Sequence, residues 1–175
     1  MKFDDIKKLN PEEILNLANG KEIGNYVLPG LTSKLIYEGS NYRLRLFING
    51  RSPFNNTIVP HSHRFNIKCK VIKGWACNKI FEVPENEYQV KNSDEWMVCE
   101  QKYNGDIGQY DFKEKTVKSF YGNSNVYSAS LNPEEDGSSI YQMQHTDIHS
   151  IQFGKNSIIL FEESFVDTQV SEVLL

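Results

Sequence analysis

The four histidines of the chain fall into two close pairs. His61 and His63 are one residue apart, and His145 lies shortly before His149. A neutral imidazole is a good ligand for iron, zinc, copper and nickel, and histidine is the commonest protein ligand of such metals. The pairing therefore favours a metal site. The alternative is that His61 and His63 are ordinary turn or surface residues after Pro60.

The segment that contains the first histidine pair has the alternation of a β-strand. Residues i and i+2 of a strand point to the same side, so both imidazoles are expected on one face. That face continues with Phe65, Ile67, Cys69 and Val71, whereas the opposite face carries Arg64, Asn66, Lys68 and Lys70. We expect a strand over residues 59–72 whose apolar side faces the interior, with the two imidazoles at its start.

The elements that must position these histidines are mostly short strands. Turn-forming pairs such as Asn49-Gly50 and Gly122-Asn123 interrupt the extended segments. Many short strands separated by such turns predict a β-sandwich or a β-barrel. The predicted strands cover residues 42–48, 59–72, 76–83, 96–103, 110–121, 126–131, 139–145, 149–153 and 157–165.

The N-terminal segment 1–20 is predicted to be helical and to pack on the outside of the strands. Asn10 is a suitable N-cap, and Glu13, three residues later, can complete a capping box. Gly20 can end the helix. The polar segment 85–95 is a predicted surface loop.

The composition fits one globular domain that spans residues 1–175. Hydrophobic residues make up 39% and charged residues 24%, which allows a real core and argues against disorder. The net charge of −4 and the pI of about 5.6 argue against a nucleic-acid partner, which requires a basic surface. Three cysteines without Cys-x-x-Cys spacing, and no apolar leader or membrane segment, favour a cytoplasmic protein.

The spacing after the first histidine pair resembles the first motif of the cupin superfamily. In that motif a His-x-His is followed by three or four residues, an acid, six residues and a glycine. His61, His63 and Gly74 match this spacing without a gap, but Ile67 occupies the position of the acid. A site of three histidines and one glutamate is therefore not available from the motif residues.

The second cupin motif is a histidine that begins a short hairpin, and His149 with the turn at residues 154–157 resembles it. Gln144 and Thr146 stand where this motif usually has a proline and a glycine. The resemblance covers about residues 42–165. It implies a mainly β fold, the cupin-type double-stranded β-helix or jelly-roll barrel, with the N-terminal helical segment outside it.

The resemblance further implies a metal site of His61, His63 and His149, like that of the thiol dioxygenases among the cupins. Those enzymes hold iron with three histidines and leave positions for substrate and oxygen. Iron(II) is the expected metal, with zinc, nickel or manganese as alternatives. His145 is an alternative third ligand or a residue that orients the substrate. Cys69 is an alternative soft ligand, although a buried inert cysteine is commoner.

All four arginines precede or adjoin the first histidine pair. Arg43 and Arg45 share a strand face and are candidate substrate-binding residues, because a guanidinium can hold a carboxylate or phosphate with two hydrogen bonds. The favoured alternative is an outer strand face paired with surface acids. Arg64 and Tyr141 are candidate catalytic residues, with core packing as the commoner role for the Tyr141 ring.

Three kinds of function are compatible with these features. The first is a non-haem Fe(II) dioxygenase or other oxidoreductase that acts on a small molecule. The second is a non-redox metal enzyme, namely an isomerase, epimerase or hydrolase. The third is a module that binds a small ligand without catalysis. The sequence has no nucleophile elbow, phosphate-binding glycine loop or His-Glu-x-x-His helix. We expect no nucleic-acid or membrane partner, and we expect pairing of edge strands in a homodimer.

Overall fold

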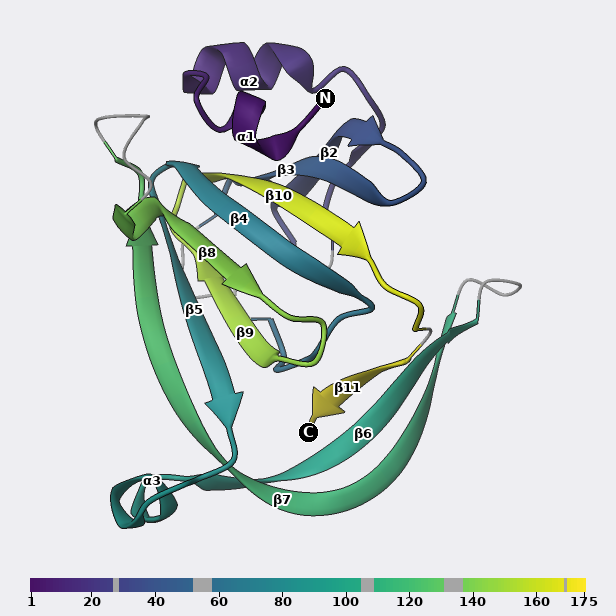
Figure 1. Ribbon diagram of the computed structural model, residues 1–175, viewed down its shortest axis with the longest axis vertical. Coiled ribbons are helices and arrows are strands. Elements are labelled where there is room, and N and C mark those ends of the chain that lie inside the picture. Colours follow the sequence, from purple (N-terminus) through teal and green to yellow (C-terminus); the bar gives the residue numbers. More distant parts are fainter. Residues whose placement is uncertain (27–28, 52–57, 105–108, 131–136, 169) are drawn as a thin grey trace.

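Two antiparallel β-sheets, built from segments with alternating apolar side chains, make up most of the chain (Figure 1). The computed structural model describes residues 1–26, 29–51, 58–104, 109–130, 137–168 and 170–175. In spatial order, the six-stranded sheet contains β1 (Glu22–Ile23), β2 (Leu31–Glu38), β3 (Tyr42–Asn49), β10 (Ile158–Phe165), β4 (Phe65–Lys73) and β8 (Ile140–Met143). The five-stranded sheet contains β11 (Val170–Leu174), β6 (Asp94–Asn104), β7 (Gln109–Ser128), β5 (Trp75–Glu82) and β9 (Ile148–Phe153). The helices are α1 (Phe3–Ile6), α2 (Pro11–Leu17) and α3 (Glu87–Lys91), with a 3-10 turn at Gly137–Ser139.

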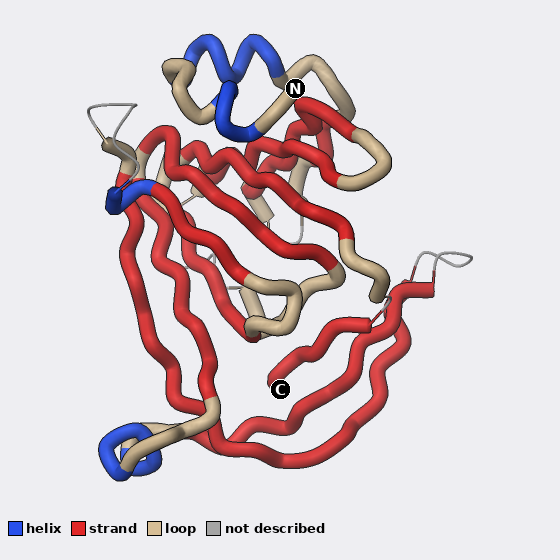
Figure 2. The backbone as a smooth tube through the Cα atoms, viewed as in Figure 1, coloured by secondary structure: helices blue, strands red, loops and turns tan. Residues whose placement is uncertain are grey.

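The chain passes back and forth between the two sheets, which is the strand order of a jelly roll. From β3 it crosses to residues 60–62, beside β9, and it returns to the first sheet as β4. β5, β6 and β7 lie in the second sheet, and β8 to β11 then alternate between the two. The predicted mainly β barrel with a helical N-terminal segment is confirmed (Figure 2).

Residues 60–62 close the five-stranded sheet into a ring by joining its two edge strands, β9 and β11. The four backbone hydrogen bonds run from His61 N–H to the His149 carbonyl (2.8 Å), from His149 N–H to the His61 carbonyl (3.0 Å), from Ser62 N–H to the Glu172 carbonyl (2.8 Å) and from Leu174 N–H to the Pro60 carbonyl (3.0 Å). Both edges are thereby covered at this point, and their backbone groups are satisfied.

Each face of the closed sheet contacts a different apolar core. All five strands contribute to a small cluster formed by Phe81, Val98, Phe120, Ile148 and Leu174, with Trp96 packed against it. The main core lies between the two sheets and includes Phe47, Ile67, Cys69, Val71, Tyr141, Ile151, Phe153, Ile159 and Phe161. On β9, strand parity places His149 on the same face as Ile151, toward the main core.

Helices α1 and α2 cover the outer face of the six-stranded sheet (Figure 1). Phe3 and Ile14 are buried there against Leu44, Leu46 and Leu160. Both faces of β3 and β10 are therefore covered, one by the helices and the other by the second sheet. No helix in the described part of the chain is long and apolar enough to span a membrane.

The N-terminal segment forms two helices instead of one. The predicted capping box is confirmed: the Glu13 N–H donates to Asn10 Oδ1 (3.0 Å), and the Asn10 N–H donates to Glu13 Oε2 (2.9 Å). The predicted helix end at Gly20 is wrong, because α2 ends at Leu17. The Gly20 N–H donates instead to the Leu35 carbonyl (3.1 Å), which draws this part of the chain to the sheet.

The predicted strand over residues 59–72 is wrong in its first half. β4 begins at Phe65, and residue His61 pairs only as an isolated bridge. Pro60 has no N–H to give to a ladder. Ser62 bonds to β11 instead of β9, because its N–H donates to the Glu172 carbonyl and its hydroxyl oxygen accepts from the Glu172 N–H. The segment is thus held between two strands.

β7 continues through Gly122-Asn123, where a break was predicted. These two residues pair with β5, so the antiparallel ladder keeps them extended. Leu131, the predicted end of the strand over 126–131, lies outside the described residues. The barrel also extends beyond the expected range 42–165, since β2 precedes it and β11 follows it.

Helix α3 lies inside the segment 85–95 that was predicted to be a loop. The Gln89 N–H donates to Asn86 Oδ1 (3.0 Å), and this side-chain cap explains why the helix begins there. None of its residues is buried, so the helix remains a surface feature.

We expect Ser62→Ala to destabilise the protein by about 1–2 kcal/mol, because the partly buried backbone N–H of Glu172 would lose its acceptor. The Ser62 side chain is buried, and its hydroxyl oxygen accepts a hydrogen bond from Glu172 N–H (2.7 Å). Urea denaturation measures the change. Ser164→Ala is the matched control, since its hydroxyl bonds to Glu162 at a partly exposed position, and it should cost about 0.5 kcal/mol or less. Equal losses would contradict the importance of ring closure.

Candidate metal centre

The side chains of His61, His63 and His149 converge, with His149 buried and His61 and His63 half-buried. One ligand nitrogen of each histidine lies within 4.8 Å of the other two. His61 and His149 are adjacent because their backbones pair directly, and the His63 N–H is held by the carbonyl of His145 (3.0 Å). Across the described residues, this is the one group of three or more His, Cys, Asp or Glu side chains so arranged. The predicted grouping of these three histidines is confirmed.

Hydrogen-bond partners determine which ring nitrogen carries the proton in two of the histidines. Asn78 Oδ1 lies 2.6 Å from His149 Nδ1, while the Asn78 amide group donates to the Met143 sulfur (3.1 Å). The Val59 carbonyl oxygen lies 2.7 Å from His61 Nδ1. Both oxygens can only accept, so each Nδ1 carries the proton and each Nε2 presents a lone pair.

His63 completes the centre through its Nε2, which lies 2.9 Å from the Nε2 of His149. When no metal is bound, His63 Nε2 can donate its hydrogen to the lone pair of His149. With the proton on Nδ1 of His63 instead, three nitrogen lone pairs face one another. Imidazole donors in such a group suit iron, zinc, copper or nickel. The residues present therefore fit a transition-metal ion.

Burial keeps the three imidazoles neutral. It lowers the pKa of His61 below the ordinary 6.5, and it lowers the pKa of His63 well below that value, with the two neighbouring rings adding to the effect. It lowers the pKa of His149 to about 3, again with a contribution from His61. Neutral imidazole is the form that binds metals, so the centre is ready for a cation at neutral pH.

The two alternative ligands lie outside this group. His145 is tied to Asn66, since its backbone N–H donates to Asn66 Oδ1 (2.8 Å) and its Nδ1 lies 3.3 Å from the same atom. Cys69 is fully buried, and burial raises the pKa of its thiol well above the ordinary value. Because the thiolate is the form that binds metals, this environment disfavours Cys69 as a ligand. The structure brings His149, and not His145, to the first pair.

Arg43 and Arg45 face the interior, so the favoured outward orientation is wrong. They lie on the same face of β3 as Phe47, which belongs to the main core. The other face of β3 carries Leu44 and Leu46, which pack under the N-terminal helices. Because the N-terminal helices cover the face of β3 that carries Leu44 and Leu46, the arginines lie on the face toward the second sheet, opposite to the favoured prediction.

Glu163 of β10 is the acid that pairs with both arginines. Its side chain is buried, with only 3% exposure, and it forms an ion pair with Arg43 directly across the β3–β10 ladder. The Arg45 Nε lies 3.4 Å from the Oε2 of Glu163, and Arg45 Nη1 donates to Ser33 Oγ (3.1 Å). This charged cluster lies inside the barrel, beside the main core.

The structure separates the two candidate catalytic residues. Tyr141 lies in the main core, with its ring 4.6 Å from that of Tyr127 and beside Cys69, its partner in the β4–β8 ladder. Burial raises the pKa of Tyr141 well above its ordinary value. Its surroundings are those of a packed core tyrosine. Arg64 is partly exposed at the bend that precedes β4.

The sequence analysis missed Asn78 and Glu163. Asn78 is 2% exposed and orients the ring of His149. The sequence signal for Asn78 was that it lies two residues after Ala76, so it points to the same side of the strand as that apolar residue. Glu163 shares its parity with Phe161 in the same way. Alternation alone would have marked both as polar groups directed inward.

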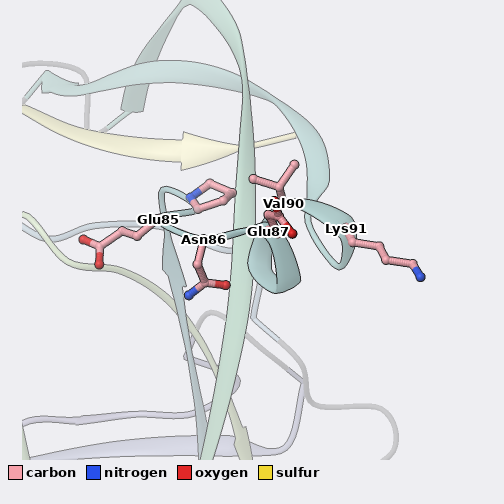
Figure 3. A pocket seen from close by; sticks show the side chains of 6 residues that line it. Glu85, Asn86, Glu87, Val90 and Lys91 are labelled. Carbon is pink, nitrogen blue, oxygen red and sulfur yellow. The ribbon is translucent and has the colours of Figure 1, made fainter.

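A surface pocket lies beside the exposed helix α3 (Figure 3). It is lined by Pro84, Glu85, Asn86, Glu87, Val90 and Lys91. None of these side chains was a candidate for the metal or the substrate, and none is a histidine or cysteine. The pocket is therefore separate from the group of three histidines.

Asn78→Ala should weaken metal binding by about 10- to 100-fold, because His149 would lose the hydrogen bond that fixes its tautomer and orientation. A competition titration of Zn²⁺ against a chromophoric chelator measures the affinity. Asn66→Ala is the matched control, since it removes a partner of His145 alone, and its affinity should stay within about 3-fold of the parent. A loss in Asn66→Ala with unchanged affinity in Asn78→Ala would place the third ligand at His145.

The protein without metal should lose stability as the pH falls from 6.5 to 5. The unfolded chain binds protons near pH 6.5, whereas folding holds the pKa of His149 at about 3, so acid favours unfolding. Each such histidine contributes at most about 1.4 kcal/mol per pH unit. Urea denaturation in the presence of chelator at pH 7, 6 and 5 measures this trend, and His149→Gln should flatten it. A stability that does not change over this range would contradict the burial of neutral histidines.

Comparison with family models found no match, and comparison with curated proteins found none either. Among solved structures, the chain is similar to KdgF from Halomonas sp., with 12% identity, a TM-score of 0.42, and coverage of 81% of this chain and 85% of the other. It is also similar to hydroquinone 1,2-dioxygenase from Sphingomonas sp. TTNP3, with 8% identity, a TM-score of 0.43, and coverage of 77% and 65%. A third is hydroxypropylphosphonic acid epoxidase from S. wedmorenis, with 8% identity, a TM-score of 0.40, and coverage of 84% and 56%.

These likenesses are at low identity, and the chain spans less than two thirds of the dioxygenase and the epoxidase. No function is carried over from them. The chain's own strand order and its grouped histidines are the features that the resemblance to the cupins implied. The protein has a β-barrel with the strand order of a jelly roll, in which the side chains of three histidines converge.

Proposed function

We propose that the protein is a metal-dependent oxidoreductase of the non-haem Fe(II) dioxygenase type, acting on a small molecule. The observation that carries the proposal is the convergence of His61, His63 and His149 on one point, with neutral rings and with Nε2 lone pairs directed inward. Three imidazoles whose ring nitrogens face one another at this distance form a donor set that a transition-metal ion can occupy.

The ligand set supports a catalytic metal more than a structural one. Within the described residues, the group contains three histidines and no fourth Cys, Asp or Glu. Three protein ligands leave coordination positions open, whereas structural zinc sites are closed by four. Bound iron would supply the redox chemistry that dioxygen requires. The resemblance to the three-histidine thiol dioxygenases supports iron as the metal.

The surrounding residues supply positioning and exclusion of water. Asn78 holds the His149 ring, and the Val59 carbonyl holds the His61 ring. The ring of Phe65 stacks on His63 with a centroid distance of 5.0 Å. Ile67 and Met143 of the main core form an apolar wall on the face that carries the histidines. An apolar wall keeps bulk water from reactive species.

Metal content tests the ligand assignment directly. The protein is purified without a metal-affinity tag and without chelator, and elemental mass spectrometry gives the metal per chain. We expect near-stoichiometric iron, and a loss of most of it in His61→Ala, His63→Ala and His149→Ala. His145→Ala is the matched control and should retain metal, because its side chain bonds to Asn66. Equal retention in all four variants would refute the site.

Oxygen consumption tests the reaction class. Iron-loaded protein is screened in an oxygen electrode against thiols, phenols, amino acids and oxo-acids, with His63→Ala as the inactive control. Substrate-dependent uptake lost in the control would support the proposal. Stoichiometric zinc or nickel without oxygen consumption would indicate the non-redox enzyme instead. No metal after anaerobic iron loading would indicate a ligand-binding module.

A further inference from the structure

The long strand β7 has an open edge along its first half. Its residues 109–120 pair with β6, whereas β5 pairs only with residues 121–128. Among the described residues, no strand pairs with residues 111–119 on the side that faces away from β6. This part of β7 forms the lower margin of the molecule in Figure 1. An open edge of a sheet is a template on which a further strand can pair.

Two large apolar side chains are exposed on this edge. Phe112 is 60% exposed and Val117 is 53% exposed. Both lie on the same face of the sheet, because their partners on β6, Gln101 and Met97, are an even number of residues apart. Exposed apolar side chains on an open edge are typical of a site of association.

The opposite face of the same edge carries charged side chains. Asp111 pairs with Lys102 of β6. Lys118 pairs with Trp96, which is an even number of residues from Lys102. Asp111 and Lys118 are both exposed. One face of the edge therefore has an acid toward one end and a base toward the other.

A β-bulge at Lys115 restricts how the edge can pair. On β6, Val98 pairs with Thr116, and the next residue, Cys99, pairs with Glu114. Lys115 is the extra residue, so the alternation between the two faces shifts by one at this position. Directly opposite residues of an antiparallel pair must lie on the same face. Most registers of two such edges would set residues of different faces against each other.

One register of two identical edges keeps the faces matched on both sides of the bulge. In it, a two-fold axis passes through the bulge, and Phe112 of each copy lies opposite Val117 of the other. Asp111 then lies opposite Lys118. Each contact occurs twice, which gives two apolar pairs on one face and two ion pairs on the other. A shift by two residues would instead set Lys113 opposite Lys118, which repel each other.

A surface concavity lies where the end of the second strand would arrive. It is lined by Val83, Pro84, Val90, Ser93, Lys118 and Ser119. In the matched register, Tyr110 of the second copy lies opposite Ser119, at the wall of this concavity. Val83, Val90 and Tyr110 are all exposed in the single chain. Pairing of the edges would therefore cover apolar side chains beyond the strands themselves.

We propose that two copies of the chain form a two-fold dimer in which their β7 edges pair in this antiparallel register. The occupant of the edge is a second copy, because the charges and the apolar side chains complement their own copies and the bulge excludes the neighbouring registers. The pairing of edge strands expected from the sequence is thereby assigned to residues 110–119. The inference is independent of the proposed function, since no histidine and no metal takes part.

Sedimentation velocity of the full chain over a concentration series measures the dimer. We expect the dimer fraction to rise with protein concentration and to be the same with and without chelator. Hydrogen–deuterium exchange of dilute and concentrated protein locates the interface. Amides within residues 111–119 should exchange more slowly in the concentrated sample.

An exchange of charges tests the register. Asp111→Lys and Lys118→Asp each set like charges opposite each other twice, and each should raise the dissociation constant about 10-fold. The double variant should return it to the parent value. Within one chain Asp111 pairs with Lys102, and the exchange does not restore that pair. Recovery in the double variant therefore reports contact between copies.

Val117→Asp tests the apolar face. A charge placed against Phe112 of the other copy should weaken the dimer about 100-fold. Val126→Asp is the matched control, because Val126 is 62% exposed on the same strand but pairs with β5, and it should leave the dimer unchanged. Circular dichroism checks that each variant is folded. If Val117→Asp fails to fold, the exchange of charges still decides the question.

Four outcomes would overturn the inference. A protein that stays monomeric at every concentration would leave the edge to a strand of a different protein. A dimer that Val117→Asp does not weaken would place the interface elsewhere. A double variant as weak as the single variants would refute the register. Open-ended association beyond the dimer would refute the two-fold closure.

Discussion

The backbone pairing of His61 with β9 and β11 is the interaction on which the rest of the structure depends. It closes the five-stranded sheet, and it places the His61 and His149 side chains on one face of a directly opposed antiparallel pair. Side chains in such a pair start only about 5 Å apart at Cβ. His63 follows after one residue and is fixed by the His145 carbonyl. Barrel closure and assembly of the histidine centre are therefore the same event.

Two polar centres lie near each other in the barrel: the group of three histidines and the cluster of Arg43, Arg45 and Glu163. The histidines present lone pairs in an apolar setting, which favours a cation, and burial keeps their rings neutral. The arginine cluster is an ionic group, in which the Glu163 carboxylate pairs with Arg43 and Arg45 of the neighbouring strand. Phe65 lies between them and contacts both.

Much of the fold and of the histidine group follows from local patterns in the sequence. Alternation marks β3, β4, β5 and β10, and the capping box joins Asn10 and Glu13, which are three residues apart. The spacing of His61 and His63 and the hairpin after His149 were sufficient to bring the three side chains together.

What could not be predicted depends on contacts between distant segments. Period-two alternation separates the two faces of β3, but it does not say which face the helices cover. The orientation of Arg43 and Arg45 was therefore predicted incorrectly. β11 is a five-residue strand whose role appears only when it pairs with β6 and with residues 60–62. The support of His149 by Asn78 joins positions 71 residues apart.

The wide separation of the paired segments also sets the order of events during synthesis. His63 and His149 are 86 residues apart, and Ser62 and Glu172 are 110 residues apart. Closing loops of this length costs chain entropy before the contacts repay it, which slows folding. A nascent chain on the ribosome cannot complete the ring until β11 has emerged from the exit tunnel. Binding of a metal by the complete histidine group would therefore follow closure of the barrel and would stabilise the folded state.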